Sequence, residues 1–318
     1  MSHQIHQPTR IAIIGAGNVG SSFAYGLLLS GLASEIVLVD ANHAKAEGEA
    51  MDLNHAAPLS KPVRVWAGDY ADCAGAAITV ITAGSAQRPG ETRLDLVQRN
   101  ADVFHQIVPR VVQNNPQGIL LIATNPVDVL SYVAWKLSGL PAARVIGSGT
   151  ILDTARFRFL LSQRFDVDPR SVHAYIIGEH GDSEVPVWSL ANIAGMRLPV
   201  YCRQNNMTCG FDDLEDIFHQ TRDAAYEIIQ RKGATYYAIA SGLVRIVEAI
   251  LRDEGAVLSV STLINGYYGI DDVYLSIPSI VDRAGVERNI YLELSEEEVA
   301  SLQDSAHILK GFIAQLNF

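Results

Sequence analysis

Short apolar runs alternate with longer segments of mixed polarity through the first half of the chain. Continuous apolar runs are typical of strands that are buried on both faces of a parallel sheet. The runs cover residues 11–14, 35–39, 64–66, 77–82, 118–123 and 144–147, and the segments with helical composition cover 21–30, 44–55, 94–113 and 127–138. This alternation predicts an α/β fold whose first domain, residues 1–149, is a Rossmann-type doubly wound parallel sheet.

The second half of the chain, residues 150–318, has a different order of elements. Helices are expected at 151–165, at 213–252 with Gly233 as a point where the helix can break, and at 296–316. Strands are expected at 172–177, 256–263 and 273–280. The pattern predicts a mixed α+β domain that would carry the substrate, joined to the first at a structural boundary near residue 149.

The stretch from residue 10 to residue 40 has the pattern of a dinucleotide-binding unit. Its first apolar run ends in Gly15-Ala16-Gly17-Asn18-Val19-Gly20, a helical segment follows, and its second apolar run ends in Asp40. In such a unit the three glycines permit a tight turn, the approach of a pyrophosphate and close packing of helix on strand. The acid accepts hydrogen bonds from a ribose hydroxyl. An ordinary βαβ turn is the alternative, but the flanking strands and the acid favour a nicotinamide dinucleotide site.

Composition narrows the classes of function. The net charge of −11 argues against a surface for nucleic acid or an anionic membrane. The cysteines, Cys73, Cys202 and Cys209, are scattered and show no zinc-binding spacing, which favours a reducing compartment and no metal site. Residues 1–9 lack the apolar part of a secretory signal, and no apolar run approaches the ~18 residues of a membrane span. A cytoplasmic protein is therefore expected.

His180 is the main candidate for acid–base chemistry. It lies between glycines, beside Glu179 and Asp182, directly after an apolar run, and sites of α/β proteins gather at strand ends. Asp153 and Arg156 are three residues apart on an expected helix and therefore share a face. An exposed loop histidine and a local surface ion pair remain alternatives at this level.

Other charged and polar residues are placed by periodicity and by loop composition. Arg158 is two residues beyond Arg156, about 200° around the helix, so it must point elsewhere. Gln87 and Arg93 lie in or beside a loop rich in glycine and proline at 83–90. Such a loop could close over a substrate, although an ordinary surface loop has the same composition.

Six motifs give the chain a resemblance to a known family. They are GAGNVG with Asp40, AQRPGETRLDLVQRN (86–100), ATNPVD (123–128), GSGTILDTARFR (147–158), GEHGDSEVPVWS (178–189) and KGATYY (232–237). In this order, and in a chain of this length, they resemble bacterial L-lactate dehydrogenases of the lactate/malate dehydrogenase family. The resemblance implies an NAD-dependent oxidoreductase of glycolysis and fermentation that reversibly reduces pyruvate to (S)-lactate.

The resemblance also implies roles for individual residues. His180 would give a proton to the carbonyl oxygen of pyruvate, and Asp153 would hold the imidazole and favour its charged form. Arg156 would bind the substrate carboxylate in a two-pronged fork that lysine could not copy. Arg93 would polarise the carbonyl as charge develops. Further substrate-site positions are Gln87, Asn125, Asp128 and Thr235.

The same resemblance implies which residues bind the cofactor and which bind an allosteric activator. The matching cofactor positions are Gly15, Gly17, Val19, Gly20, Asp40, Lys45, Tyr70, Gly84, Ser85, Ala123, Asn125 and Ser148. Arg158 and His173 match the positions that bind the allosteric activator fructose 1,6-bisphosphate between subunits. The resemblance further implies a homotetramer.

Gln87 bears on the choice of substrate. Malate dehydrogenases resemble one another in having an arginine at this position, two residues before the proline that is Pro89 here. That arginine would pair with the second carboxylate of oxaloacetate, whereas a neutral glutamine leaves it unpaired and so favours pyruvate. Arg88, next to Gln87, departs from the pattern, and a one-residue shift of the loop would bring in its charge.

Two alternatives to the lactate dehydrogenase reading stay open. One is a malate dehydrogenase or a broader 2-hydroxyacid dehydrogenase, against which Gln87 argues. The other is a catalytically silent nucleotide-binding protein, which the joint presence of His180, Asp153, Arg156 and Arg93 disfavours.

Overall fold

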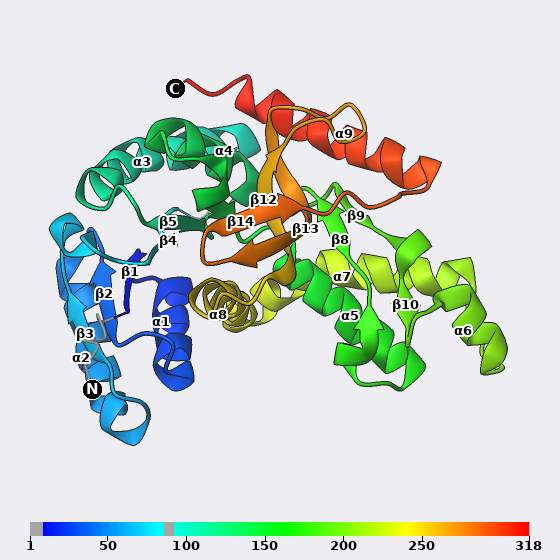
Figure 1. Cartoon of the computed structure of the whole chain (residues 1–318), viewed down its shortest axis with the longest axis horizontal. Helices are drawn as coiled ribbons and strands as arrows, with labels where there is room; N and C mark the ends of the chain where they lie inside the picture. The colour runs from blue at the N-terminus through cyan, green and yellow to red at the C-terminus, as the bar shows by residue number, and fades with distance from the viewer. Residues whose placement is uncertain (1–8, 86–91, 318) are drawn as a thin grey trace, which may run out of the picture.

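A computed structural model describes residues 9–85 and 92–317 of the chain, and Figure 1 gives its element labels. The first half confirms the expected alternation of strands and helices, with small shifts at the element ends. Its elements are β1 (Arg10–Ile14), α1 (Asn18–Ser30), β2 (Glu35–Val39), α2 (His43–Ala56), β3 (Arg64–Ala67), β4 (Ile78–Ile81), α3 (Arg93–Asn114), β5 (Ile119–Ile122), α4 (Val127–Ser138) and β6 (Val145–Gly147).

The strands of this half pair in parallel in the order β3-β2-β1-β4-β5-β6. The order reverses between β1 and β4, and ligands of doubly wound sheets bind in the crevice beyond the carboxyl ends of the strands at this point. Ile11 and Ile13 of β1 point into one core, and Ala12 and Ile14 point into the other. Both faces of the strand are therefore covered, which is why the run is apolar throughout.

The second half begins with α5, continues through short strands, two long helices and three antiparallel strands, and ends with α9. Its elements are α5 (Ile151–Phe165), β7 (Val172–His173), β8 (Ile176–Gly178), β9 (Glu184–Pro186), β10 (Asn192–Ile193), β11 (Met196–Arg197), α6 (Leu198–Gln204), α7 (Phe211–Lys232), α8 (Tyr237–Leu251), β12 (Ala256–Ile264), β13 (Val273–Asp282), β14 (Gly285–Asn289) and α9 (Glu296–Ile313). Gly233 ends α7 with a positive φ of 85°, so the expected break in the long helical region is confirmed.

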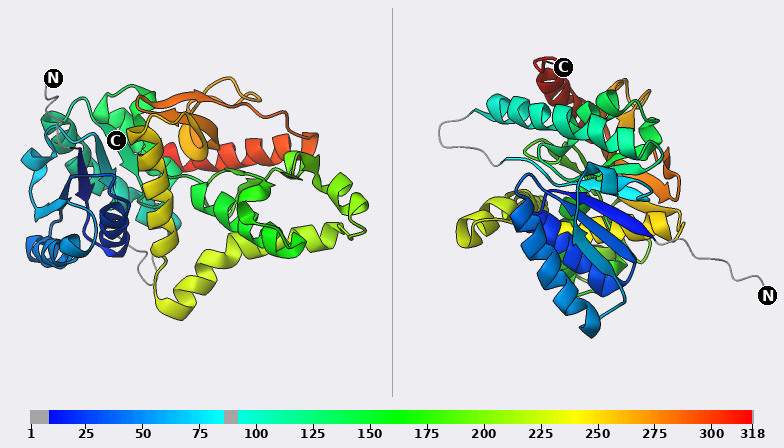
Figure 2. Two further views of the ribbon diagram at one scale, coloured as in Figure 1. Left: turned by 60° about the horizontal axis from the view of Figure 1, so that its bottom comes forward. Right: turned by 90° about the vertical axis from the view of Figure 1, so that its left-hand side faces the viewer.

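The sheet does not stop at the end of the first half. Ser261 of β12 pairs with Gly147 of β6, and β13, β8 and β9 extend the same sheet. Helices α1, α2 and α8 pack against one core of the sheet, while α3, α4 and α9 pack against the other. Figures 1 and 2 show α8 beside α1, although these helices are far apart in sequence. The continuous sheet thus carries side chains from both halves to one region.

The expectation of a single strand over 172–177 is wrong. β7 pairs with β10 in a small three-stranded sheet, whereas β8 pairs with β13 and β9 in the main sheet. Ala174 and Tyr175 carry the chain from one sheet to the other, and their carbonyl oxygens accept hydrogen bonds from Arg158 Nε and from the backbone N–H of Val187. An apolar run cannot reveal such a change of partner, because both strands bury their apolar residues.

The scattered spacing of the three cysteines gave no sign of a disulfide, and the structure contains one. Cys202, near the end of α6, and Cys209, just before α7, form a disulfide, while Cys73 is free and buried. The disulfide joins two positions seven residues apart, so it ties the end of α6 to the segment that leads into α7.

Candidate active site

A cavity of about 580 Å³ lies at the point where the strand order reverses. Gly15 and Gly17, after β1, line one side, and Ala83 and Gly84, after β4, line another. Asp40, at the end of β2, closes a third side. Because three parallel strands end here, the cavity takes its lining from loops that are distant in sequence.

The glycines of the first loop fit a bound dinucleotide. Gly15 has a φ of +107°, and a Cβ there would lie 2.7 Å from the backbone nitrogen of Ala83. A Cβ on Gly20 would collide with the carbonyl oxygen of Gly15. A Cβ on Gly17, in contrast, would meet nothing within 4 Å, so the backbone beside the N-terminus of α1 is open to the cavity. This is the space that a pyrophosphate needs.

Asp40 both shapes the loop and faces the cavity. Its Oδ2 accepts a hydrogen bond of 2.6 Å from the backbone N–H of Ala16, and its Oδ1 accepts one of 2.8 Å from that of Asn42. A carboxylate offers about four acceptor sites. Asp40 therefore retains the capacity to accept a hydrogen bond from a ribose hydroxyl while it holds the glycine loop.

The other predicted cofactor residues divide into two groups. Lys45, Tyr70, Gly84 and Ser85 line the cavity with the loop glycines. Four more are not among the described residues that line it: Val19 packs against the core, Ser148 is 3% exposed, Ala123 is half-buried, and Asn125 lines the second cavity described below. For these four, a cofactor role stays a prediction.

A second cavity, of about 370 Å³, contains the predicted acid–base and carboxylate-binding residues. Asp153, Arg156, His180 and Asn125 all line it. Its other lining residues are Leu96, Pro126, Gly181, Asp182, Glu184, Arg222, Ala225, Tyr226 and Ile229. The lining therefore joins α3, α5, α7 and the loop between β8 and β9.

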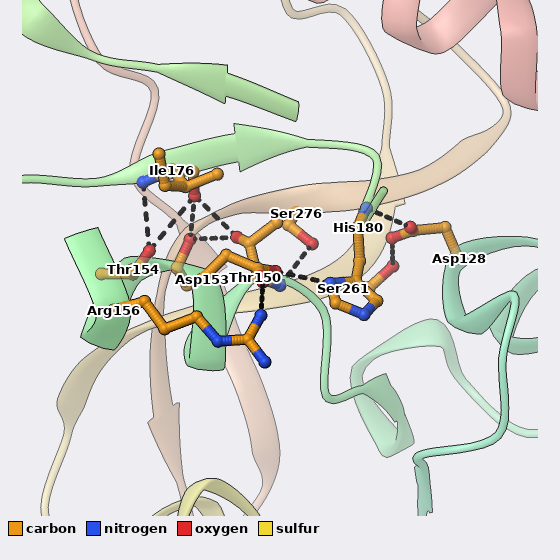
Figure 3. Close-up of polar contacts among 10 residues, drawn as sticks. Asp128, Thr150, Asp153, Thr154, Arg156, Ile176, His180, Ser261 and Ser276 are labelled. Carbon is orange, nitrogen blue, oxygen red and sulfur yellow. Dashed lines mark hydrogen bonds and ion pairs between the residues drawn. The ribbon is translucent and has the colours of Figure 1, made fainter. Parts of the chain in front are cut away.

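Asp153 is bonded to both His180 and Arg156 (Figure 3). Its Oδ2 lies 2.5 Å from Nδ1 of His180, and its Oδ1 accepts a hydrogen bond of 2.9 Å from Nη1 of Arg156. The side chain of Asp153 is 3% exposed, that of Arg156 12% and that of His180 24%. One buried carboxylate thus orients an imidazole and a guanidinium, while both retain a face toward the cavity.

Helix α5 is held in place by hydrogen bonds across the sheet. Thr150, the residue before α5, donates its hydroxyl to the carbonyl oxygen of Ile176 in β8 at 2.6 Å. Its backbone N–H donates to Oγ of Ser276 in β13 at 3.1 Å. Figure 3 shows these contacts beside Asp153 and Arg156, so the spacing between α5 and the loop of His180 is set by the sheet.

Asp128 takes a place that the motif alone did not reveal. It is 1% exposed and is not among the described residues that line either cavity. Its Oδ2 accepts a hydrogen bond of 2.8 Å from the backbone N–H of His180, and its Oδ1 accepts one of 2.6 Å from Ser261 Oγ. Burial raises the pKa of Asp128 to about 6. The observed contacts of Asp128 therefore hold the backbone of His180 in position, and Asp128 does not line the cavity in which a substrate-site role was expected.

The charges around His180 favour its protonated form. Burial alone would lower the pKa of the imidazole, but the charge of Asp153 and the hydrogen bond to it outweigh burial and raise that pKa to about 9. Burial would likewise raise the pKa of Asp153, yet the charge of His180 holds it below the ordinary value of an aspartate. At neutral pH the pair is thus an imidazolium beside a carboxylate, and His180 has a proton to donate.

Arg222 and Glu184 line the second cavity but were not singled out from the sequence. Arg222 is on α7, and no motif marks it. Glu184 lies inside the GEHGDSEVPVWS motif, where only the proximity to His180 could have drawn attention to it. Thr235, expected at the substrate, is half-buried between α7 and α8 and is not among the described residues that line the cavity.

Asn100 connects the two cavities. Its Oδ1 accepts a hydrogen bond of 2.9 Å from the backbone N–H of Ser85, and its Nδ2 donates one of 2.9 Å to the carbonyl oxygen of Asn125. Ser85 lines the first cavity and Asn125 the second. Gln87 and Arg88 lie outside the described residues, and the structure describes Arg93 only as the first residue of α3.

Arg158 points away from the substrate cavity, as the helical periodicity predicts. Its Nε donates to the carbonyl oxygen of Ala174 at 2.9 Å, and its guanidinium lies 5.0 Å from the ring centroid of Tyr175. It lines a third cavity, of about 570 Å³, together with Arg170 and Arg245. His173 is exposed on β7, one residue before Ala174.

Two further findings concern the described part of the chain. No helix in it combines the length and the apolar character needed to cross a membrane. Across residues 9–85 and 92–317, no three histidine, cysteine or acidic side chains gather in an arrangement that could hold a metal ion.

Comparison with known proteins agrees with the geometry of the two cavities. Residues 9–147 match the NAD binding domain of lactate/malate dehydrogenase, and residues 150–317 match the alpha/beta C-terminal domain of the same family. The chain is 55% identical to L-lactate dehydrogenase 1 of Clostridium acetobutylicum over 302 residues, covering 95% of this chain and 96% of that protein. It is 55% identical to an L-lactate dehydrogenase of Priestia megaterium over 314 residues, covering 98% of each.

A solved structure gives the same result for the fold. The crystal structure of a minor L-lactate dehydrogenase from Enterococcus mundtii superposes with a TM-score of 0.95 at 45% identity, covering 98% of this chain and 99% of that one. Two family domains that together span almost the whole chain, and relatives of this similarity, leave one conclusion. The chain belongs to the lactate/malate dehydrogenase family, and its first domain binds NAD.

Proposed function

We propose that the protein is an L-lactate dehydrogenase that reversibly reduces pyruvate to (S)-lactate. One observation carries the proposal: Asp153 is bonded to both His180 and Arg156 in a cavity that Asn100 links to the cofactor cavity. Such an arrangement joins a proton donor to a carboxylate-binding cation. The relatives named L-lactate dehydrogenase support the choice of substrate.

Each residue of the cavity has a role in this proposal. Bound NADH supplies the hydride. Arg156 binds the substrate carboxylate through its planar guanidinium, with Asp153 holding that guanidinium in place. His180 donates a proton to the carbonyl oxygen of pyruvate and takes one from the hydroxyl of lactate in the reverse direction.

Several other residues complete the proposed substrate site. Asn125 would hydrogen-bond the carbonyl oxygen, Thr235 would lie beside the methyl group, and Arg93 would stabilise the charge that develops on the carbonyl oxygen. Asp128 would keep the backbone of His180 in register with the substrate through the hydrogen bond to the His180 N–H.

The assay that tests the function is the oxidation of NADH in the presence of pyruvate, of oxaloacetate or of neither. Rapid oxidation with pyruvate and slow oxidation with oxaloacetate is the expected result. A preference for oxaloacetate would instead favour a malate dehydrogenase, the alternative that Gln87 opposes. A protein that binds NADH but oxidises it with neither acid would be a silent nucleotide-binding protein.

Asp153→Asn should move the upper pH limit of pyruvate reduction to lower pH. The carboxylate of Asp153 is the main group that raises the pKa of His180 to about 9, and loss of a nearby charge typically moves a pKa by ~1–3 units. Since pyruvate reduction requires the charged imidazole, the rate should then fall at lower pH than in the wild type. The measurement is the pH profile of kcat/KM for pyruvate, which reports groups of the free enzyme. An unshifted upper limb would rule out the pairing.

We further propose that the enzyme is a homotetramer activated by fructose 1,6-bisphosphate through Arg158 and His173. Arg158 lies outside the substrate cavity, and the carbonyl oxygen of Ala174, the residue after His173, accepts its hydrogen bond. Arg170 and Arg245 line the same cavity as Arg158; Arg170 is paired with Asp168 and Arg245 with Glu254, so a phosphate would have to compete with these carboxylates. Strand β7 leads into β8 and from there to His180, which connects this region to the proposed catalytic residues.

Fructose 1,6-bisphosphate should lower the KM for pyruvate, most strongly at low protein concentration, where tetramers dissociate. Coupling between two sites is typically ~1–3 kcal/mol, or about 5- to 150-fold in affinity. Arg158→Gln should remove the effect without changing the rate measured in the absence of activator. Arg164→Gln, on the same helix but paired with Asp213, is the matched control and should retain activation. If the bisphosphate changes neither the pyruvate kinetics nor the sedimentation, the enzyme lacks this allosteric regulation.

A further inference from the structure

Glu184 is a buried acid in the wall of the substrate cavity. It is the first residue of β9 and is 6% exposed. Its Oε1 is fully buried and has no hydrogen-bond partner among the described residues. Burying an ionised carboxylate costs much free energy unless the charge is paired. The protonation state of Glu184 therefore requires an explanation.

Of the three acids that line the cavity, Asp182 is exposed, whereas Asp153 and Glu184 are buried and have very different surroundings. Asp153 is bonded to both His180 and Arg156, which compensate its charge. No ion pair of Glu184 within 4 Å is found in the described part of the chain, and Arg222, the other arginine of the cavity, has its Nε 3.1 Å from Oδ1 of Asp223. When two neighbouring acids differ in this way, one remains ionised and the other holds its proton.

The electrostatic surroundings favour the neutral form of Glu184. Burial is the largest influence, and the charge of Asp153 acts in the same direction. The positive charges of His180, Arg156 and Arg222 oppose both but do not compensate them, so the pKa of Glu184 is raised to about 9. Near neutral pH the two buried acids of the cavity therefore differ in charge: Asp153 is a carboxylate and Glu184 is a carboxylic acid.

Other groups near Glu184 come from the loop before β9, from α7 and from α9. Glu179 is 2% exposed, and its Oε2 accepts a hydrogen bond from Ser183 Oγ. Asp182 accepts one of 2.9 Å from the hydroxyl of Tyr226 on α7. Helix α9, which packs against β9, presents the uncharged Ser305 to this loop.

We propose that Glu184 is a determinant of substrate affinity, whose neutral form leaves Arg156 to the substrate carboxylate and whose ionised form opposes binding of that carboxylate. This inference rests on the proposed function, because it assumes that a monocarboxylate occupies the cavity. Ionised Glu184 would add a second buried negative charge, beside Asp153, to a site that must accept an anion, and like charges within a poorly solvated site repel strongly. The neutral acid avoids this repulsion.

The proposal predicts that two protons, rather than one, accompany substrate binding at high pH. His180 must be protonated to donate to the substrate carbonyl, and Glu184 must be protonated to admit the carboxylate. Well above both pKa values, the dissociation constant of a substrate analogue should therefore rise by about 100-fold per pH unit, against about tenfold if His180 alone is involved. The steeper pH dependence requires that Glu184 itself gains a proton when the substrate binds. A purely structural role of Glu184 would not produce it.

The experiment is the binding of oxamate, an uncharged-amide analogue of pyruvate that keeps its carboxylate, to the NADH-saturated enzyme as a function of pH. Glu184→Gln keeps the size of the side chain but cannot ionise. The affinity lost between about pH 7 and pH 10.5 should be about 30-fold smaller in Glu184→Gln than in the wild type, because pH 10.5 is about 1.5 units above the pKa of Glu184. A variant with a damaged site would instead bind worse at every pH.

Three controls make the outcome decisive. Glu227→Gln removes one acid from the exposed surface of α7 and should keep the pH dependence of the wild type. Glu184→Asp restores an ionisable group and should restore the two-proton dependence. Calorimetry of the wild type in buffers of different ionisation enthalpy counts the protons directly, so the test stands even if Glu184→Gln does not fold.

The possible results separate this inference from the proposed function. Uptake of about one proton at high pH by the wild type, or an unchanged profile in Glu184→Gln, would overturn the role of Glu184 alone. Failure of the NADH-saturated wild type to bind oxamate near neutral pH would overturn the proposed function as well. Uptake approaching two protons that falls to one in Glu184→Gln would support the inference.

Discussion

His180→Asn is expected to lower pyruvate turnover by about 10²–10⁴-fold, the usual contribution of a general acid. Asparagine preserves a hydrogen-bonding group beside Asp153 but has no titratable proton to transfer. The affinity for NADH should be nearly unchanged, because His180 lines the substrate cavity and is not among the described residues that line the cofactor cavity. The loss should therefore appear in kcat and not in cofactor binding.

The measurement combines steady-state kinetics with a titration of NADH fluorescence. His219→Asn is the matched control, since it makes the same change on an exposed face of α7, where His219 lies 4.0 Å from Glu215. A His180 variant that retains more than about a tenth of the wild-type kcat would be incompatible with its role as the acid, given the size of such effects. A variant that loses NADH binding would point to misfolding, which thermal unfolding would reveal.

Gln87→Arg is expected to shift the preference from pyruvate toward oxaloacetate. The new guanidinium would pair with the second carboxylate of oxaloacetate, while pyruvate would leave it unpaired in a closed site. A polar group that one substrate satisfies and the other leaves unpaired can discriminate by about 10⁴–10⁵-fold. Although Gln87 lies outside the described residues, Ser85 lines the cofactor cavity and Leu96, beyond the loop, lines the substrate cavity.

The comparison to make is the ratio of kcat/KM for the two acids in the wild type and in the variant. Arg88→Gln is the informative companion, because it removes the neighbouring charge that could serve oxaloacetate after a shift of the loop. If Arg88→Gln alters the ratio and Gln87→Arg does not, Arg88 and not Gln87 faces the substrate. A ratio that neither substitution changes would mean that specificity is set elsewhere in the cavity.

The elements that the sequence predicted well are those whose formation is decided locally. The apolar runs of β1, β2, β4 and β5 and the glycine loop at 15–20 carry their own signals, since a strand buried on both faces must be apolar and a tight turn demands glycine. The alternation of strands and helices predicted a parallel, doubly wound sheet, which is confirmed, and the structure shows its strand order to be β3-β2-β1-β4-β5-β6. The motifs placed His180, Asp153 and Arg156 on the correct elements, and the structure then joined them by hydrogen bonds.

The elements that the sequence did not predict depend on partners. The strand expected over 172–177 divides between two sheets, because β10 pairs with the first part of this apolar run and β13 pairs with the last part. The disulfide of Cys202 with Cys209 depends on how the chain turns between α6 and α7. The short strands β9, β10 and β11 are too brief to have a readable period.

The amino-acid sequence was enough to predict the nucleotide-binding fold, the family and the chemical nature of the candidate proton donor and carboxylate binder. Each of these is encoded in residues that are close in the chain or in motifs of fixed order. Three features became apparent only in the folded chain: Asp128 supports the backbone of His180, Arg222 lines the substrate cavity, and Glu184 is buried there without a hydrogen-bond partner at Oε1 among the described residues. The reason is physical: the environment of a charge, and hence its pKa, is set by burial and by neighbours from distant segments, which the linear order of residues does not specify.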